Sequence, residues 1–321
     1  MIRRRSLLAA AGLAPFARQA AAQTFPERTL RLVVPFAPGG SQDVMGRVFA
    51  NRLGALLGQS VIVENRGGAG GLLGGQEVAR AAPDGHTILL VTAGQWTIAK
   101  ALKRQMGYDP DADFAPVIHL VDSPVVLIAA AGSGIADVRG LIAAARARPD
   151  TLNYASTGVG TNTHLLMEDF LQREGLRVTH VPYRGAAPAF NDLLAGAIQV
   201  MFVSAPSVLA GDASKFRVLA VTSPERFAPL PDVPTMIEAG VAGFTASIWT
   251  GIAVPARTPA PVIARLHAAF TEILGEAEVK ERLATLGATP AGGPTERFAA
   301  LLREDLARWT GVVERGNITA D

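Results

Sequence analysis

The chain alternates short apolar runs with amphipathic stretches, and turns rich in glycine and proline separate them. Most of the runs are rich in Val, Ile and Leu and lack alternating polar positions, which is typical of strands buried on both faces. The expected strands are Leu30–Pro35, Ser60–Glu64, Thr87–Thr92, Val125–Ala130, Leu152–Ala155, Thr179–Val181, Gln199–Val203, Val218–Thr222 and Thr250–Val254.

Between these runs, apolar residues recur at helical spacing. Val48, Phe49 and Leu53 lie on one such stripe, and the segments Asp137–Arg148 and Thr161–Arg173 show the same pattern. Alternating strands and helices predict an α/β fold with parallel sheets. Pro83-Asp84-Gly85 supplies a stop before the strand at Thr87.

The last third of the chain changes character, because after Val254 the pattern predicts helices alone. We expect this segment to pack back on an earlier sheet. The expected helices are Pro259–Leu274, Ala277–Leu286 and Pro294–Arg315.

The length of 321 residues suits two domains of ordinary size rather than one. Residues 1–22 have the features of an export signal. Arg4-Arg5-Ser6-Leu7-Leu8 follows the twin-arginine pattern, and Ala20-Ala21-Ala22 supplies small residues for cleavage before Gln23. A Sec signal is the alternative to Tat export. Both routes predict a periplasmic protein, and the apolar stretch is too short for a membrane anchor.

Charge and cysteine content exclude several classes of function. The four arginines of residues 1–22 account for the basic character, since the remaining 26 basic and 28 acidic residues give a formal charge of −2. No basic stripe with interleaved aromatics is present, so no nucleic-acid partner is expected. The chain has no cysteine, which rules out disulfides, thiolate catalysis and cysteine-based metal sites.

Three turns rich in small residues connect an expected strand to an expected helix. In such turns glycine permits close backbone approach, and the free N–H groups of the following helix attract anions. The alternative is purely structural, with Ser41 and Thr161 serving as helix N-caps. The turns are Pro35-Phe36-Ala37-Pro38-Gly39-Gly40-Ser41-Gln42-Asp43, Ser156-Thr157-Gly158-Val159-Gly160-Thr161-Asn162-Thr163-His164 and Val181-Pro182-Tyr183-Arg184-Gly185-Ala186-Ala187-Pro188.

With these turns the chain closely resembles the solute receptors of tripartite tricarboxylate transporters, also called Bug proteins. The resemblance runs from about Leu30 to the C-terminus through separated motifs in family order. The matching stretches are Val34–Gly40 with Asp43, Gly58–Arg66, Gly68–Gly71, Pro83–Gly85, Tyr154–Ser156 with Gly158 and Gly160, His164, His180–Gly185, and Leu230–Thr235 with Glu238 and Gly240.

The resemblance implies a type II periplasmic-binding-protein-like α/β fold, with two parallel or mixed-sheet lobes joined by a hinge. It implies that residues 23–122 and 224–321 form lobe 1 and that residues 123–223 form lobe 2. The chain would cross between the lobes near Asp122-Ser123 and return near Ser223-Pro224.

By the same resemblance, backbone N–H groups and small hydroxyls of both lobes hold a carboxylate. The expected ligand-binding residues are Phe36, Gly40, Ser41 and Asp43 on lobe 1, and Ser156, Thr157, Gly158, Gly160, Thr161, Tyr183, Gly185 and Ala187 on lobe 2.

The implied function is a monomeric receptor that delivers a di- or tricarboxylate, an aromatic acid or a similar ligand to the transporter's membrane subunits. Met201-Phe202-Val203-Ser204 stands where the family often has an acidic residue, which disfavours an amino-acid ligand. A periplasmic carboxylate sensor acting on a signalling partner is the alternative.

An enzyme on the same fold is a remote alternative, because no nucleophile elbow or phosphate-binding loop is present. His164 and Glu168 share a helix face, but two ligands without a third make a weak metal site, and we expect a structural hydrogen bond from His164. No catalytic residue, metal or cofactor is therefore expected.

Overall fold

The computed structural model describes residues 25–209 and 215–319, and the expected export signal lies outside the described residues. The strands are β1 (Leu30–Val34), β2 (Val61–Asn65), β3 (Thr87–Val91), β4 (Phe114–Ala130), β5 (Asn153–Ser156), β6 (Thr179–Pro182), β7 (Val200–Ser204), β8 (Phe216–Val221), β9 (Ser247–Pro255) and β10 (Thr289–Pro290). The helices are α1 (Ser41–Leu57), α2 (Leu72–Ala79), α3 (Thr97–Ala101), α4 (Pro110–Asp113), α5 (Val138–Ala147), α6 (Asn162–Glu174), α7 (Ala186–Leu194), α8 (Ala205–Leu209), α9 (Ala260–Gly275), α10 (Ala277–Thr285) and α11 (Thr295–Gly316).

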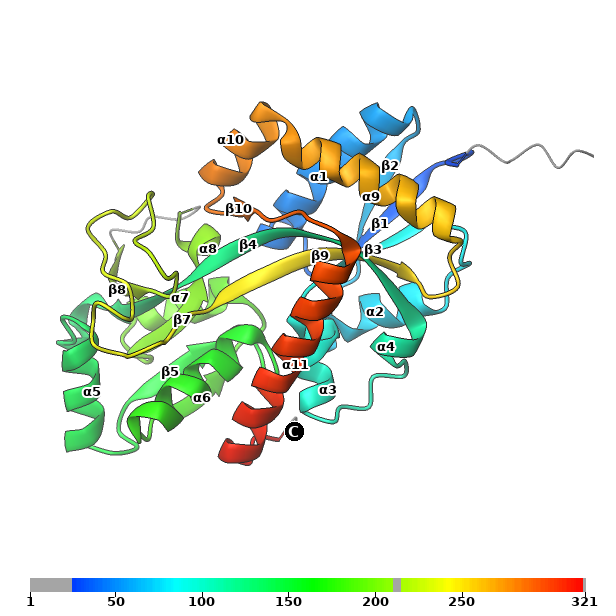
Figure 1. Cartoon of the computed structure of the whole chain (residues 1–321). Helices are drawn as coiled ribbons and strands as arrows, with labels where there is room; N and C mark the ends of the chain where they lie inside the picture. Colours follow the sequence, from blue (N-terminus) through cyan, green and yellow to red (C-terminus); the bar gives the residue numbers. More distant parts are fainter. Residues whose placement is uncertain (1–24, 210–214, 320–321) are drawn as a thin grey trace, which may run out of the picture.

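The elements form two α/β lobes, as predicted (Figure 1). In lobe 1, β1 lies between β2 and β3 and is parallel to both. Successive strand residues face opposite sides of the sheet. Leu32 and Val34 therefore pack with α1 and α9 on one face, whereas Val33 belongs to the core on the other face, with Val78 of α2. This double burial explains the uninterrupted apolar runs.

Lobe 2 repeats the layering with β5 parallel to both β6 and β7. The second half of β4 runs antiparallel to β7 and β8. The prediction of parallel pairing therefore holds for β1–β3 and β5–β7, while β4, β8 and β9 make the sheet mixed.

Two long strands join the lobes. β4 pairs with β9 from Phe114 to Pro124, and from Val125 onward it pairs with β7 and β8 instead. Figure 1 shows both strands running through the middle of the molecule. The apolar pattern predicted only Val125–Ala130, because Pro116 and two register shifts interrupt the first half of β4. The lobe boundaries near Asp122-Ser123 and Ser223-Pro224 remain predictions.

The C-terminal helix α11 packs on earlier elements of both lobes, as expected of this segment. Toward lobe 1, Thr97 Oγ1 donates to Asp305 Oδ2 at 2.5 Å. Toward lobe 2, Arg308 Nη2 donates at 3.3 Å to Oδ2 of Asp169, a fully buried residue of α6. The helix therefore lies across the junction that β4 and β9 form.

Gly251 of β9 is closely packed at this junction. A Cβ there would overlap the ring of Phe298 on α11 and would lie 3.0 Å from the carbonyl oxygen of Ile118. We expect Gly251→Ala to lower the free energy of unfolding by about 1–3 kcal/mol through overpacking, measured by urea denaturation. Gly275→Ala is the control, because nothing lies within 4 Å of a Cβ there. Equal stability of the two variants would contradict this account.

Candidate ligand-binding site

The turns identified in the sequence lie at the carboxyl ends of parallel strands. The turns 35–40 and 66–71 follow β1 and β2 and leave the same edge of the lobe 1 sheet. The turns 157–161 and 183–185 follow β5 and β6 and leave one edge of the lobe 2 sheet. Ligands of open α/β sheets bind at such edges.

The two edges meet along a seam between the lobes. A Cβ on Gly70, in the turn after β2, would lie 4.0 Å from the carbonyl oxygen of Val159 in the turn after β5. The turn after β2 also touches the first turn, since a Cβ on Gly67 would lie 3.3 Å from the Ala37 amide nitrogen. The fold thus brings the first and second turns toward one region from different lobes.

The helices after the three turns begin without a side-chain cap. Their N-cap residues are Gly40 for α1, Thr161 for α6 and Gly185 for α7, and none accepts a hydrogen bond with its side chain from a backbone N–H of its helix. In α5, by contrast, Asp137 accepts from the Gly140 N–H at 2.7 Å. The first amides of an α-helix have no acceptor within it and carry partial positive charge. At α1, α6 and α7 they are suited to an anion.

The alternative role as N-cap is wrong for Ser41, whereas Thr161 does hold an N-cap position but makes no capping hydrogen bond with its side chain. Ser41 is the first residue inside α1, where Gly40 holds the N-cap position. Thr161 occupies the N-cap position of α6, but its Oγ1 donates to the carbonyl oxygen of Gly158 at 2.8 Å. Its hydroxyl shapes the turn instead.

Asp43 braces the first turn. Its Oδ2 accepts from the Gly39 N–H at 2.8 Å and from Arg47 Nε at 3.1 Å, and its Oδ1 accepts from Asn65 Nδ2 at 3.0 Å. Asn65 Nδ2 also donates to the Phe36 carbonyl oxygen at 3.1 Å. Burial raises the pKa of Asp43, but these hydrogen bonds outweigh it and hold the pKa below its ordinary value. The carboxylate thus has partners within the protein, although the sequence placed it among the ligand-binding residues.

Three threonine hydroxyls line the second turn. Thr163 Oγ1 lies 2.9 Å from Thr157 Oγ1 and 3.1 Å from Thr161 Oγ1, and it accepts from the Thr157 N–H at 3.1 Å. The Gly158 N–H donates to Ser156 Oγ at 3.3 Å. These amides are engaged by side chains of the turn itself. A hydroxyl can rotate between donor and acceptor roles, so the cluster can exchange partners with a ligand oxygen.

A stack of aromatic rings supports the second turn. His180 lies between Tyr154 and His164, with ring centroids 4.7 and 4.0 Å away. His180 Nε2 is 2.7 Å from Ser156 Oγ, and the Gly160 N–H donates to His164 Nδ1 at 3.2 Å. The structural hydrogen bond expected of His164 is confirmed. Ser156 and His180 have the separation of a nucleophile and a base, but Ser156 is fully buried, so the pair supports the turn.

Burial keeps this stack uncharged. Burial, followed by the charge of neighbouring His180, lowers the pKa of His164 to about 3, and burial lowers the pKa of His180 to about 4. Glu168 accepts from Tyr154 Oη at 2.5 Å, and burial raises the pKa of this carboxyl despite that hydrogen bond. The attraction of the second turn for an anion therefore comes from the amides of α6.

The third turn adjoins the second. The Tyr183 N–H donates to the Ser156 carbonyl oxygen at 3.0 Å, and a Cβ on Gly158 would lie 3.5 Å from the Tyr183 carbonyl oxygen. Tyr183 Oη donates to Asp192 Oδ2 at 2.6 Å, so the ring is held against α7. Gly185 has φ of +116°, a conformation that favours glycine, and Ala187 is exposed in the first turn of α7.

Arg104 is a residue of the seam that the sequence analysis missed. Its Nη1 would lie 3.1 Å from a Cβ on Gly70 and 3.0 Å from a Cβ on Gly160. No motif or periodicity marks this arginine, since the fold alone brings it between turns 90 residues apart in the sequence.

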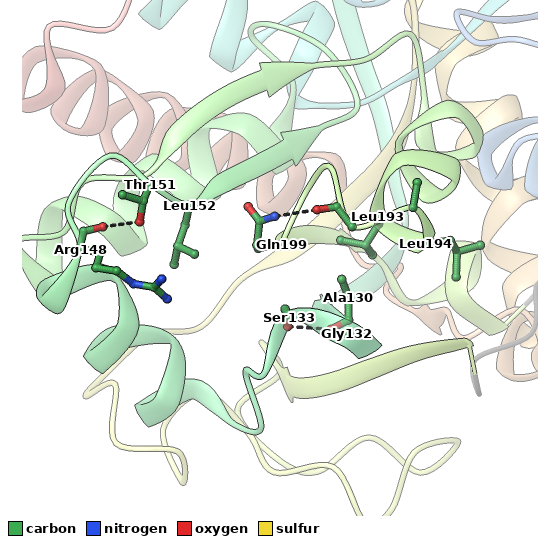
Figure 2. A pocket seen from close by; sticks show the side chains of 11 residues that line it. Ala130, Gly132, Ser133, Arg148, Thr151, Leu152, Leu193, Leu194 and Gln199 are labelled. Atoms are coloured by element: carbon green, nitrogen blue, oxygen red, sulfur yellow. Dashed lines mark hydrogen bonds between the residues drawn. The ribbon is translucent and has the colours of Figure 1, made fainter.

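A hollow in lobe 2 lies away from these turns (Figure 2). Arg148 and Thr151 line one side and Leu193 and Leu194 the other, near Leu152 and Gln199, which precede β5 and β7. It therefore opens at the opposite strand ends. Within residues 25–209 and 215–319, no group of three His, Cys, Asp or Glu side chains is placed to hold a metal ion, and no helix there is long and apolar enough to cross a bilayer.

Comparison with known proteins matches residues 45–318 to the tripartite tricarboxylate transporter family receptors. BugT of Bordetella pertussis is 36% identical to this chain over 313 residues, which cover 96% of each protein.

Solved structures agree with the two-lobe fold. The periplasmic binding protein BugD is 34% identical, with a TM-score of 0.83 over 92% of this chain and 99% of its own. An R. palustris protein solved with adipate is 35% identical, with a TM-score of 0.85 over 92% and 99%. MatC from Rhodopseudomonas palustris, solved with bound malate, is 35% identical, with a TM-score of 0.82 over 90% and 100%.

The two stacked histidines predict a pH-dependent stability. The ordinary histidine pKa is 6.5, so below that pH the unfolded chain binds protons that the folded chain does not. Between pH 7 and 5 each histidine should lower the free energy of unfolding by roughly 2 kcal/mol. Glu168 acts in the opposite direction below its raised pKa.

Urea denaturation of the wild type, His164→Gln and His180→Gln at several pH values measures this effect, and the Glu168 contribution is common to all three. We expect shallower pH dependence in both variants. The same slope in all three proteins would show that the histidines do not titrate as described.

Proposed function

The chain belongs to the tripartite tricarboxylate transporter receptor family, and from this premise we propose that it is a periplasmic receptor that captures a small carboxylate between its two lobes. It then delivers this ligand to the membrane subunits of such a transporter. One observation carries the proposal, namely the uncapped N-termini of α1, α6 and α7 at the strand ends where the lobes meet. The lobes close on the ligand and open to release it, and residues 1–22 direct export by the Tat route.

Backbone donors are sufficient for useful affinity. Micromolar binding requires about 8 kcal/mol. A hydrogen bond to a charged group contributes about 1.5–3 kcal/mol, and a helix terminus up to ~2 kcal/mol in a partly buried setting. Four or five such contacts exceed the requirement and leave a surplus against the lost freedom of the ligand.

The proposed contacts divide into donors and supports. On lobe 1, the first amides of α1 at Gly40 and Ser41 face the ligand, with Phe36 beside them. Asp43 positions this turn through Gly39 rather than binding the ligand itself. A direct contact between the Asp43 carboxylate and the ligand carboxylate would be repulsive, because both are negatively charged.

On lobe 2, the first amides of α6 and α7 supply the donors, together with the hydroxyl cluster. The turn residues assigned to this wall are Ser156, Thr157, Gly158, Gly160, Thr161, Tyr183, Gly185 and Ala187. The amides of Thr157, Gly158 and Gly160 reach a ligand only if their present side-chain partners are exchanged.

We further propose that the protein acts as a monomer and performs no chemistry on the ligand. The family consists of receptors, and the structural neighbours are solute-binding proteins. Their bound adipate and malate support a small carboxylate as the ligand class.

Ligand binding should raise the melting temperature and compact the protein. At a concentration of 100 Kd a ligand that binds only the folded state stabilises it by about 2.7 kcal/mol, or roughly 5 °C for a chain of this size. A thermal-shift screen of di- and tricarboxylates, aromatic acids and amino acids tests this, followed by solution scattering with each hit. A screen without hits, or hits without a smaller radius of gyration, would contradict capture between closing lobes.

Gly40→Val should abolish binding and leave the fold intact. Gly40 has φ of −74°, and a Cβ there would meet nothing closer than the Ala37 carbonyl oxygen at 3.5 Å, so the side chain is tolerated but covers the helix N-terminus. We expect a loss of at least 100-fold in affinity by calorimetry, with a melting temperature lowered by no more than about 3 °C, since valine is a poorer N-cap residue than glycine. The control is Gly132→Val, in the remote hollow with nothing within 4 Å. Wild-type affinity in Gly40→Val would exclude the first turn from the site.

A further inference from the structure

Arg104 carries a positive charge for which the described residues supply no side-chain partner. It follows the short helix α3, and its Nη1 is buried without a hydrogen-bond acceptor among residues 25–209 and 215–319. Within the same residues the Arg104 side chain forms no salt bridge. Proteins rarely leave a buried N–H of a charged group unsatisfied, so such a donor requires an explanation.

The position of Arg104 supplies that explanation. Nη1 lies between the turn after β2 in lobe 1 and the turn after β5 in lobe 2, at about 3 Å from Cβ positions on Gly70 and Gly160. Both glycines have φ of +71° and carry no side chain that would displace the guanidinium. The charge therefore sits on the seam where the proposed ligand is enclosed, and it contacts both lobes.

The groups around the guanidinium do not neutralise it. Tyr108 is near enough for the charge of Arg104 to act on its hydroxyl, but burial raises the pKa of Tyr108 more strongly, so the phenol stays protonated. Its Oη donates to the Gln95 carbonyl oxygen at 2.7 Å. Lys103 is exposed and adds a second positive charge nearby.

We propose that Arg104 is a second anion subsite, which binds the far anionic group of a ligand whose first carboxylate lies at the helix N-termini. This inference rests on the proposed function and narrows its ligand class to dicarboxylates. A guanidinium matches a carboxylate through two parallel hydrogen bonds, and no other side chain does so with the same geometry. Contact with both lobes makes the subsite complete only when the lobes are closed.

The experiment compares ligands that differ in the second carboxylate alone. Calorimetry with adipate against hexanoate, and with malate against 2-hydroxybutyrate, gives the preference for the di-acid. The wild type should bind its preferred di-acid at least 30-fold more tightly than the matched mono-acid. Arg104→Gln should lower di-acid affinity 10- to 100-fold and change mono-acid affinity less than threefold.

Two further variants separate contact from charge. Arg104→Lys keeps the charge without the paired donors, and we expect an intermediate loss of di-acid affinity together with a wild-type melting temperature. Lys103→Gln removes a neighbouring charge and should leave the preference unchanged. If Arg104→Gln does not fold, Arg104→Lys decides the question by the same di-acid to mono-acid ratio.

The outcomes distinguish this inference from the proposed function. A wild type that binds no carboxylate in the screen overturns the proposed function itself. A wild type that binds di-acids with unchanged preference in both Arg104 variants overturns the subsite alone. Equal weakening of di-acid and mono-acid identifies Arg104 as a contact between the lobes, and this also overturns the subsite.

Discussion

Backbone N–H groups that have no acceptor in their own helix are the constraint around which this structure is arranged. Gly40, Thr161 and Gly185 hold the N-cap positions of α1, α6 and α7 without capping them. Parallel strands place these helix starts at sheet edges, since each helix begins just beyond a strand's carboxyl end. A cap from aspartate, as in α5, would have satisfied one of these amides and placed a negative charge where we propose that the anion binds.

The side chains that hold these turns in place are either uncharged or paired with other groups of the protein. The Asp43 carboxylate accepts hydrogen bonds from Arg47, Asn65 and the Gly39 N–H. These donors offset its negative charge near the start of α1. Beneath the second turn, burial keeps His164 and His180 uncharged. The turns thus keep their shape without an unpaired charge of their own. The positive charge at the seam comes from Arg104.

Two strands and one helix connect the lobes. β4 and β9 pass through the junction as paired strands, and α11 lies across it with bonds to Thr97 on one side and Asp169 on the other. β4 has two register shifts where it pairs with β9 and a third, between Leu127 and Ile128, where it pairs with β8, and such irregularities bend a strand. The opening that we propose would be a rotation of the lobes about these strands.

The sequence by itself determined the α/β class, most strands to within two residues, the three turns and the family, because these depend on local periodicity and on motifs in fixed order. The sequence did not predict the first half of β4, since Pro116 and the register shifts interrupt the strand there. Only the tertiary structure decided that Asp43 braces its turn and that Arg104 meets Gly70 and Gly160. Gly39 is only four residues from Asp43, but Asn65 and the two glycines at Arg104 lie on segments far away along the chain, and no local pattern encodes such contacts.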